Sequence, residues 1–337
     1  MSFPTRPLGR NGPQVTAIGC GLMGLSRFYG AVGTEEERLA FLDHVYASGQ
    51  RFWDTADMYG DSEDLLGTWF RRNPGARETI FLATKFGNVA TGGVRSDPAY
   101  VREALARSLA RLGVDHVDLY YVHRVDQVTP IEDTIDVMVE LKKEGKIRHL
   151  GLSEVTADTI RRAQAVHPIA AFQIEYSPFE TLIEKPESGL LAVCRELGIA
   201  VVAYSPLGRG LLTGRYRSTA DFPAGDFRTL APRFADPDNL AHNLKLVDAI
   251  AAVAKTKGCT PGQLTLAWLC SQGPDIFPIP GTKKEAYFDE NIGAMAVHLT
   301  DAEVAQVRAA VDAADIAGER YPAATTKWLL GSTPARK

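Results

Sequence analysis

The sequence predicts an α/β fold in which eight parallel strands close into a (β/α)8 TIM barrel, with an N-terminal β-hairpin and extra C-terminal helices. Short apolar runs rich in β-branched residues alternate with amphipathic helical runs, and nearly continuous apolar strands require helices to cover their sheet. Eight such units favour a closed barrel over an open doubly wound sheet. No Pro- or Ser-rich linker or change of composition divides residues 1–337, so we expect a single domain.

The elements follow from the spacing of the apolar residues. Strands are predicted at 15–21, 51–55, 80–85, 117–123, 147–152, 171–175, 200–204 and 276–279. Helices are predicted at 34–48, 62–71, 97–111, 130–144, 156–166, 189–197, 240–257 with 261–271, and 283–293. Thr34 before three glutamates and Thr260 before Pro261 are typical helix starts. Gly113 and Gly198 are typical of the position after a helix.

Three further segments lie outside this alternation. Residues 7–18 are predicted to form the hairpin, with Asn11-Gly12 as its turn. The longest irregular stretch is 207–239, and a loop of that length in a compact domain is usually functional. After the eighth unit we expect an extra helix at 301–314 and a polar tail at 318–337.

Composition excludes several classes of function. The chain is 45% hydrophobic and 23% charged with a formal net charge of −4, which indicates a globular protein with neither a nucleic-acid nor a membrane surface. It has no apolar run long enough for a membrane-spanning helix, and its first residues lack the apolar segment of a signal peptide. The four scattered cysteines are typical of buried reduced thiols, so we expect a cytoplasmic protein. The histidines show no metal-binding spacing, and we predict no metal site.

Reactive side chains gather where three consecutive strands end. The second predicted strand ends at Asp54, and Tyr59 follows in the loop; the third ends at Lys85 and the fourth at His123. Active sites of barrels lie at the carboxyl ends of the strands. Since neighbouring strands are about 4.8 Å apart, the four side chains are expected within contact range.

That group suits proton transfer to oxygen. A free tyrosine titrates near pH ~10, and an adjacent lysine cation lowers that pKa. Asp54 would hold Lys85 charged, Tyr59 would exchange a proton with a carbonyl or alcohol oxygen, and His123 would orient the substrate. The carbonyl carbon then needs a nucleophile. No serine elbow, catalytic cysteine or metal motif is evident, so a hydride from a nicotinamide is the natural partner.

Each of these residues taken alone has an ordinary explanation. Asp54 would be a turn or cap residue, Lys85 a surface lysine, and His123 a core imidazole; Tyr59 would be a loop aromatic. Their joint occurrence at consecutive strand ends favours the catalytic interpretation.

Residues 19–24 have the G-x-G-x-x-G spacing of a Rossmann dinucleotide-binding motif. This interpretation is weak, because the Rossmann motif requires the third glycine to open a helix, whereas the next helix here begins only near Thr34.

The motifs resemble those of the aldo-keto reductase superfamily along nearly the whole chain. Asp-Thr-Ala-x-x-Tyr-Gly at 54–60, Ala-Thr-Lys-Phe-Gly at 83–87 and Tyr-Val-His-Arg-Val-Asp at 121–126 match its catalytic tetrad. Gly-Leu-Ser-Glu at 151–154 and Gly-Glu-Arg-Tyr-Pro at 318–322 resemble the branch with YakC-type and perakine-type reductases. The resemblance implies that Tyr59 is the general acid/base, that Lys85 and Asp54 tune its pKa, and that His123 orients the substrate.

The resemblance also implies a cofactor site. Gly21, Leu22 and Met23 would border the nicotinamide ribose, Ser153 and Gln173 would bind the carboxamide, and Tyr204 would stack on the ring. Asp54 would also contact the cofactor. Ser205, Leu207, Gly208 and Gly210 would form the pyrophosphate loop. Gly281, Thr282, Lys283, Lys284, Glu290 and Asn291 would bind the adenosine end, at the start of the last helix of the barrel. The two lysines favour NADPH over NADH.

Three positions in two segments depart from the family pattern. Glu154 replaces the usual asparagine, and a carboxylate can accept a hydrogen bond from the carboxamide but cannot donate one. Gly281 and Tyr287 stand where many relatives have lysine and arginine, so Lys283 or Lys284 would bind the 2′-phosphate, and the sequence does not choose between them.

The expected reaction is reduction of a small aldehyde or ketone to an alcohol. Specificity would come from the loops at 27–33, 87–95, 124–129 and 207–239. Phe28, Tyr29 and Phe86 would either line the substrate pocket or serve only in packing. The alternative is a regulatory subunit that binds the nicotinamide cofactor with little turnover, as in channel β subunits; the absence of an extended segment before residue 8 argues mildly against it.

Overall fold

The computed structural model describes residues 3–89 and 92–336. Eight parallel strands lie side by side in chain order: β3 Cys20–Gly21, β4 Phe52–Asp54, β5 Phe81–Phe86, β6 Val117–Val122, β7 Ile147–Ser153, β8 Ala171–Glu175, β9 Ala200–Tyr204 and β10 Ile276–Pro278. The amide of Gly19 donates to the carbonyl of Pro278 (2.8 Å), and the amide of Gly21 donates to that of Pro280 (3.2 Å). These bonds join the first strand to the last, and the predicted (β/α)8 fold is confirmed.

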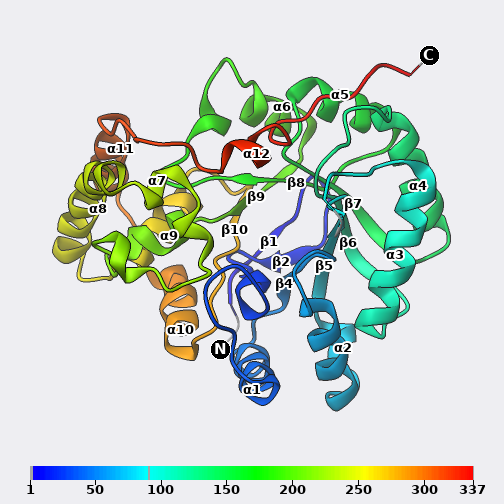
Figure 1. The fold of residues 1–337 in the computed structure, drawn as a ribbon, viewed down its shortest axis with the longest axis horizontal. Helices are drawn as coiled ribbons and strands as arrows, with labels where there is room; N and C mark the ends of the chain where they lie inside the picture. Colours follow the sequence, from blue (N-terminus) through cyan, green and yellow to red (C-terminus); the bar gives the residue numbers. More distant parts are fainter. Residues whose placement is uncertain (1–2, 90–91, 337) are drawn as a thin grey trace.

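Helices surround the strands on the outside (Figure 1). They are α1 Glu35–Ala47, α2 Ser62–Arg72, α3 Pro98–Leu112, α4 Ile131–Lys143, α5 Ala157–Val166, α6 Leu190–Leu197, α8 Pro237–Lys257, α9 Pro261–Ser271 and α10 Glu285–Gly293. Thr34 and Thr260 each form a capping box, as their sequence context predicts. Because each cap satisfies otherwise unpaired amides, the helix starts are determined locally.

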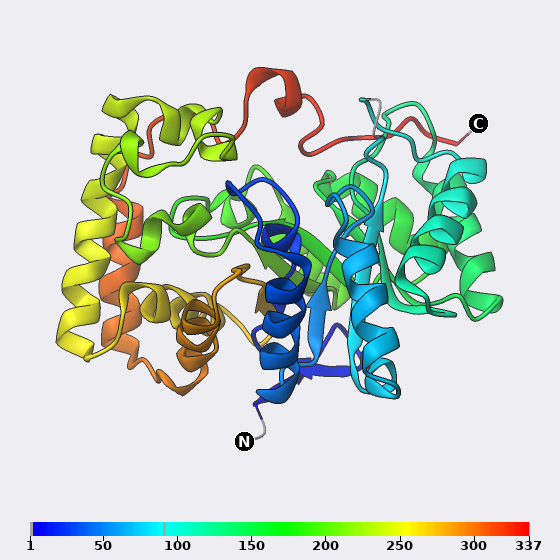
Figure 2. The ribbon, with the colours of Figure 1, turned by 60° about the horizontal axis from the view of Figure 1, so that its bottom comes forward.

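The hairpin closes one end of the barrel. Its strands are β1 Thr5–Pro7 and β2 Gln14–Thr16, paired antiparallel. Leu8 and Val15 pack with interior residues of the barrel such as Phe52 and Leu119. In Figure 2 the hairpin and the C-terminal tail lie at opposite ends of the molecule. The hairpin therefore leaves open the other end of the barrel, where the carboxyl ends of the strands lie.

Two segments differ from the sequence prediction. The apolar run 15–21 is not one strand: its first part pairs within the hairpin, and only Cys20–Gly21 joins the barrel. The stretch 207–239 is not irregular throughout, since it contains three 3₁₀ helices and α7 Pro232–Ala235. Short apolar and turn-rich segments carry too little periodicity to reveal such elements.

The C-terminal segment is more than a polar tail. After the predicted extra helix, observed as α11 Asp301–Asp312, the chain returns across the open end of the barrel and forms α12 Ala323–Thr326 (Figure 2). The amide of Gly331 donates to the carbonyl of Glu154 (3.0 Å), and the amide of Thr156 donates to that of Gly331 (3.2 Å). The tail is thus hydrogen-bonded to the end of β7.

The structure also describes some smaller features that the sequence analysis considered. Cys20 and Cys194 are buried as predicted, but Cys259 and Cys270 are partly exposed. Residues 1–2 and, in the predicted specificity loop 87–95, residues 90–91 lie outside the described residues. Within 3–89 and 92–336, none of the helices has the length and apolarity needed to span a bilayer, and no cluster of His, Cys, Asp or Glu has a composition suited to metal binding.

Close packing of α2 against α3 depends on a glycine. A Cβ atom at Gly67 would lie 2.1 Å from the carbonyl oxygen of Arg111. Glycine to alanine in a helix normally stabilises a protein by up to ~1 kcal/mol. We expect Gly67→Ala to lower the free energy of unfolding instead, by about 1 to 3 kcal/mol, because the two backbones must separate. Urea denaturation measures this change.

A matched substitution is available in α10. A Cβ atom at Gly293 would meet only the end of the flexible Gln263 side chain, at 2.8 Å. Gly293→Ala should therefore be neutral or stabilising. If Gly67→Ala is as stable as the wild type, close backbone approach does not explain this glycine.

Candidate active site

The four side chains predicted at the strand ends lie together in the structure. Lys85 Nζ donates to Asp54 Oδ1 and to the carbonyl oxygen of Thr55 (2.8 Å), and it lies 3.4 Å from the hydroxyl of Tyr59. The rings of Tyr59 and His123 are nearly perpendicular, with centroids 5.8 Å apart. All four predicted side chains are buried. Strand alternation explains this arrangement, because the interior face of β5 also carries Ala83, and the interior face of β6 carries Tyr121 beneath the lysine.

The local electrostatics differ in one respect from expectation. Burial raises the pKa of Tyr59 above its ordinary value, and the Lys85 cation opposes this rise without reversing it. Burial lowers the pKa of Lys85, but the Asp54 carboxylate and the phenol raise it further, so the amine carries its proton. Burial and the nearby cations of Arg124 and Lys85 hold the pKa of His123 well below its usual range. At neutral pH the group thus consists of a phenol, an ammonium and a neutral imidazole.

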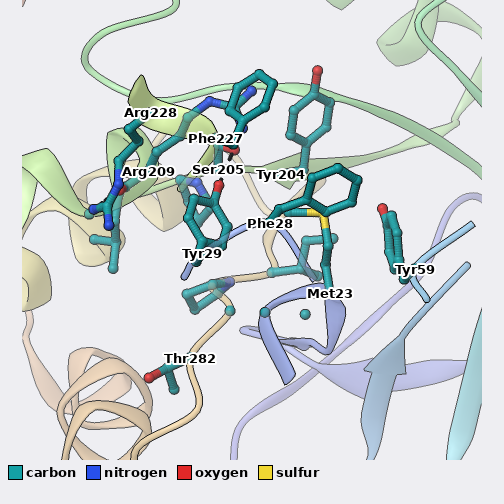
Figure 3. A pocket seen from close by; sticks show the side chains of 18 of the residues that line it. Met23, Phe28, Tyr29, Tyr59, Tyr204, Ser205, Arg209, Phe227, Arg228 and Thr282 are labelled. Atoms are coloured by element: carbon teal, nitrogen blue, oxygen red, sulfur yellow. Dashed lines mark hydrogen bonds between the residues drawn. The ribbon is translucent and has the colours of Figure 1, made fainter. Parts of the chain in front are cut away.

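A cavity of about 550 Å³ opens above this group. Most of the predicted cofactor residues line it, namely Gly21, Leu22, Met23, Asp54, Ser153, Gln173, Tyr204, Ser205, Leu207, Gly210, Gly281, Thr282, Lys283, Lys284 and Asn291. In Figure 3, Tyr59 lies on one side of the cavity and Arg209 and Arg228 on the other, with Met23 and Phe28 between them. Tyr59 and these two arginines thus occupy separate parts of one cavity.

Two predicted residues do not line the cavity. Gly208 is buried with φ +54°, and a Cβ atom there would lie 2.4 Å from the ring of Phe179. The carboxylate of Glu290 accepts a hydrogen bond from Thr260 Oγ1 (2.8 Å) and pairs with Arg215. Both residues therefore lie behind the cavity lining: Gly208 is next to Leu207 in the chain, and Glu290 pairs with Arg215.

The two candidate lysines are not equivalent. Lys283 Nζ donates to the carbonyl oxygens of Tyr29 (2.7 Å) and Ala31 (2.5 Å), so it ties the loop after β3 to the start of α10. Lys284 Nζ makes no hydrogen bond or ion pair with the described residues and lies 5.2 Å from the centre of the Tyr287 ring. Among the described residues, the Lys284 ammonium therefore has no hydrogen-bond or ion-pair partner, whereas the Lys283 ammonium has two.

The residues present fit a dinucleotide. Gly21 and Gly210 line the cavity, and a Cβ atom at either would lie close to its wall, 2.8 Å from the carbonyl oxygen of Ile279 and 3.1 Å from the ring of Tyr216. Arg209 also lines the cavity, and its Nη2 lies 3.5 Å from Glu175 Oε2, so the protein itself pairs this cation.

Comparisons with known proteins agree with this geometry. The family model described as Aldo/keto reductase family matches residues 17–312. The chain belongs to the aldo-keto reductase family. It is 52% identical over 325 residues to aldo-keto reductase str7 of Strobilurus tenacellus, with 95% of each chain covered. It is 49% identical over 341 residues to the aldo-keto reductase yakc (NADP(+)) of Schizosaccharomyces pombe (strain 972 / ATCC 24843), with 99% of each chain covered.

The likeness extends to solved structures. A crystal structure of the thermostable aldo-keto reductase Tm1743 with the inhibitor epalrestat matches with a TM-score of 0.74 at 26% identity, covering 91% of this chain and 100% of the other. The resemblance inferred from the motifs is therefore confirmed. This aldo-keto reductase is an oxidoreductase, and its family supports a nicotinamide cofactor and a small carbonyl substrate.

Sequence reasoning missed the residues that the tail brings to the site of this aldo-keto reductase. Arg320 forms a two-point ion pair with Glu154, each N···O distance being 3.0 Å. The hydroxyl of Tyr204 donates to the same carboxylate (2.8 Å) and lies 3.0 Å from that of Tyr321. The carboxylate that replaces the usual asparagine is thus bound to the tail. The signal in the sequence was the Gly-Glu-Arg-Tyr-Pro motif at 318–322, which indicated a branch of the family but not that these residues reach the site.

The aromatic candidates have different roles in this aldo-keto reductase. Phe28 and Tyr29 line the cavity, and the carbonyl of Phe28 accepts a hydrogen bond from the amide of Phe227 (2.8 Å). Phe86 is fully buried and stacks on Tyr120 with centroids 4.8 Å apart. Of the two roles considered for Phe86, packing is therefore the correct one.

A partly buried carboxyl in the loop after β4 makes stability depend on pH. Asp57 Oδ1 has no hydrogen-bond partner, and burial together with the charge of Glu63 raises the pKa of Asp57 to about 7. The unfolded chain releases this proton at the ordinary value of 3.8. The folded protein therefore loses stability as pH rises from about 4 to 7, and the whole penalty is present above pH 7.

We expect Asp57→Asn to raise the free energy of unfolding at pH 8 by about 1 to 3 kcal/mol and to have little effect at pH 4. Urea denaturation at the two pH values measures both. The exposed Asp115→Asn is the control and should change neither. An unchanged difference between pH 4 and pH 8 in Asp57→Asn would show that another group is responsible.

Proposed function

We propose that this protein is an NADPH-dependent reductase of aldehydes and ketones, with Tyr59 as the proton donor. One observation carries the proposal: a lysine ammonium is bound to Asp54 and lies 3.4 Å from the Tyr59 hydroxyl, at the base of a cavity of about 550 Å³. Packing of the core does not explain a cation buried beside a phenol, because burying a charge costs free energy.

The catalytic steps follow from the protonation states. When bound, the reduced nicotinamide supplies a hydride to the carbonyl carbon. The Tyr59 hydroxyl donates its proton to the carbonyl oxygen, which becomes the alcohol, and Lys85 stabilises the phenolate that remains. Asp54 keeps the ammonium charged and oriented. The neutral imidazole of His123 donates a hydrogen bond to the same oxygen and thereby holds the carbonyl toward Tyr59.

Other residues would bind the cofactor in parts. Ser153 and Gln173 are proposed to bind the carboxamide, Tyr204 to stack on the nicotinamide, and Gly21, Leu22 and Met23 to border its ribose. The loop containing Ser205, Leu207, Gly208 and Gly210 would bind the pyrophosphate through backbone amides. Gly281, Thr282, Lys283, Lys284 and Asn291 are proposed for the adenosine end, with Glu290 supporting that wall from behind. The NADP in the name of the yeast relative supports NADPH over NADH.

The alternative is a cofactor-binding regulatory subunit with little turnover. Because such a subunit would have a similar cavity, a measurement of activity is needed to distinguish it from a reductase. Purified protein is incubated with NADPH and a panel of aldehydes, ketones and pyridoxal, and absorbance of the reduced nicotinamide is followed. Tight NADPH binding without oxidation by any carbonyl compound would favour the regulatory function.

Removing the proton donor should separate binding from chemistry. We expect Tyr59→Phe to lower kcat for aldehyde reduction by at least ~100-fold, the range typical of a general acid. The Kd for NADPH, measured by fluorescence titration, should change little because the ring remains. Near-normal turnover in this variant would show that another group protonates the carbonyl oxygen.

The preference for NADPH should depend on Lys284. We expect Lys284→Glu to raise the KM for NADPH by about 10- to 100-fold and that for NADH by less than ~3-fold, because only NADPH carries the 2′-phosphate. Lys283→Met, assayed in parallel, should raise both KM values together, since this lysine ties the loop after β3 through Tyr29 and Ala31. Equal effects of Lys284→Glu on both cofactors would exclude it from binding the 2′-phosphate.

A further inference from the structure

A buried arginine beside the proposed proton donor contacts none of the reacting atoms in the reaction derived above, although its charge helps to keep His123 neutral. Arg124 follows His123 directly at the end of β6, is only 8% exposed, and lines the cavity. Its Nη1 donates to the carbonyl oxygen of His123 (2.6 Å) and to Ser153 Oγ (3.3 Å). These two bonds, both to neutral acceptors, hold the guanidinium in place against the wall of the cavity.

The charge of Arg124 is not neutralised by the protein. Six arginines are buried in the described part of the chain, and five of them have a carboxylate oxygen within 4.0 Å: Arg38, Arg209, Arg228, Arg233 and Arg320. Arg124 has none within that distance among residues 3–89 and 92–336. The carboxylate of Glu154, which is near enough to affect its pKa, is already bound at both oxygens by Arg320. A buried guanidinium without an ion pair is costly, which indicates that an anion binds there.

One edge of the Arg124 guanidinium makes no hydrogen bond within the described part of the chain, and its geometry indicates which kind of anion would bind there. Arg124 Nε and Nη2 make no hydrogen bond to the described residues, and these two groups lie on the same edge of the planar cation. That edge presents two parallel N–H groups, a geometry that matches the two oxygens of a carboxylate. The side chains whose charges act on Arg124 are those of Tyr204, Glu154, Tyr321 and Tyr59, and none of these four is a cation.

We infer that Arg124 forms a subsite for a carboxylate on the carbonyl substrate, so that the enzyme prefers aldehydes and ketones that carry an acidic group. This inference rests on the proposed function. The same arginine follows the substrate-orienting His123 in the chain, so the carboxylate would be bound on the side of the cavity where the carbonyl oxygen is protonated. Binding the acid at Arg124 and the carbonyl at Tyr59 would hold the substrate at two points.

The test compares substrates that differ only in charge. Wild-type enzyme is assayed with 3- and 4-carboxybenzaldehyde and with the matching carbamoylbenzaldehydes, which have the same size and no charge. We expect a higher kcat/KM for at least one acid than for its amide. In Arg124→Gln this preference should fall by about 10- to 100-fold, the range for a hydrogen-bonded charge pair, while the amides change by less than ~3-fold. Arg124→Lys, which keeps the charge but not the paired N–H groups, should be intermediate.

The control removes a guanidinium from the other end of the barrel. Arg77 donates to the carbonyls of Ile80 and His116, before β5 and β6, and pairs with Asp118. Arg77→Gln should lower stability without changing the preference for acids. Equal losses on acids and amides in Arg124→Gln, a raised Kd for NADPH, or a shifted pH profile for the amides would overturn the inference, because each assigns Arg124 to the cofactor or to Tyr59.

A binding measurement separates this inference from the proposed reaction. Calorimetric titration of the protein with benzoate and benzamide in the presence of NADP(+) needs no turnover. We expect benzoate to bind more tightly than benzamide, and this difference to be lost in Arg124→Gln but kept in Arg77→Gln. If benzoate binds in this way but no carbonyl compound is reduced, only the reductase proposal fails. If aldehydes are reduced but neither assay shows an effect of charge, only the carboxylate subsite is wrong; the wild-type comparison decides this even if the variants do not fold.

Discussion

The candidate active site depends on a single buried cation. Lys85 is 0% exposed, and its ammonium is stable there only because Asp54, the carbonyl of Thr55 and the hydroxyl of Tyr59 surround it. Removing a charge from water costs several kcal/mol even in a relaxed protein, so each of these groups must be held in position. The barrel achieves this because β4 and β5 are hydrogen-bonded neighbours, and Asp54 at the end of β4 is paired with Ala83, two residues before Lys85. The pairing of the barrel strands thus holds in place the groups that keep the buried lysine charged.

Several residues around the open end of the barrel have unusual backbone conformations. Four residues other than glycine have positive φ angles at or beside the cavity: Phe28, Glu154, Ser205 and Arg209. Such conformations cost of order 1–3 kcal/mol each and persist only where the surrounding contacts enforce them. At Glu154 the contacts come from Arg320 and Tyr204, and at Arg209 from the Tyr29 hydroxyl (3.2 Å). The tail and the long loop therefore stabilise a strained rim around the cavity, as is typical of functional sites.

Much of this could be predicted from local patterns. The period-two alternation of apolar residues on β5 and β6 indicated that Lys85 and the residue after Val122 would face the interior, and both do. Capping residues such as Thr34 act on amides within three positions, so helix starts are encoded within a few residues. Other features had no such signal. The contact between Arg320 and Glu154 joins positions 166 residues apart, and an arginine in a polar segment has the same composition whether it is solvated or buried.

The sequence by itself determined the order of strands and helices, the class of fold and the residue types that converge at the strand ends, because these depend on periodicity and on the parallel alignment of neighbouring strands. Only the tertiary structure decided which charges are paired. Lys283 is bound by backbone carbonyls, Glu154 by the tail, and Arg124 by no carboxylate of the described chain. Ion pairing depends on distances of a few ångströms between segments that are remote in sequence, and no local pattern specifies those distances.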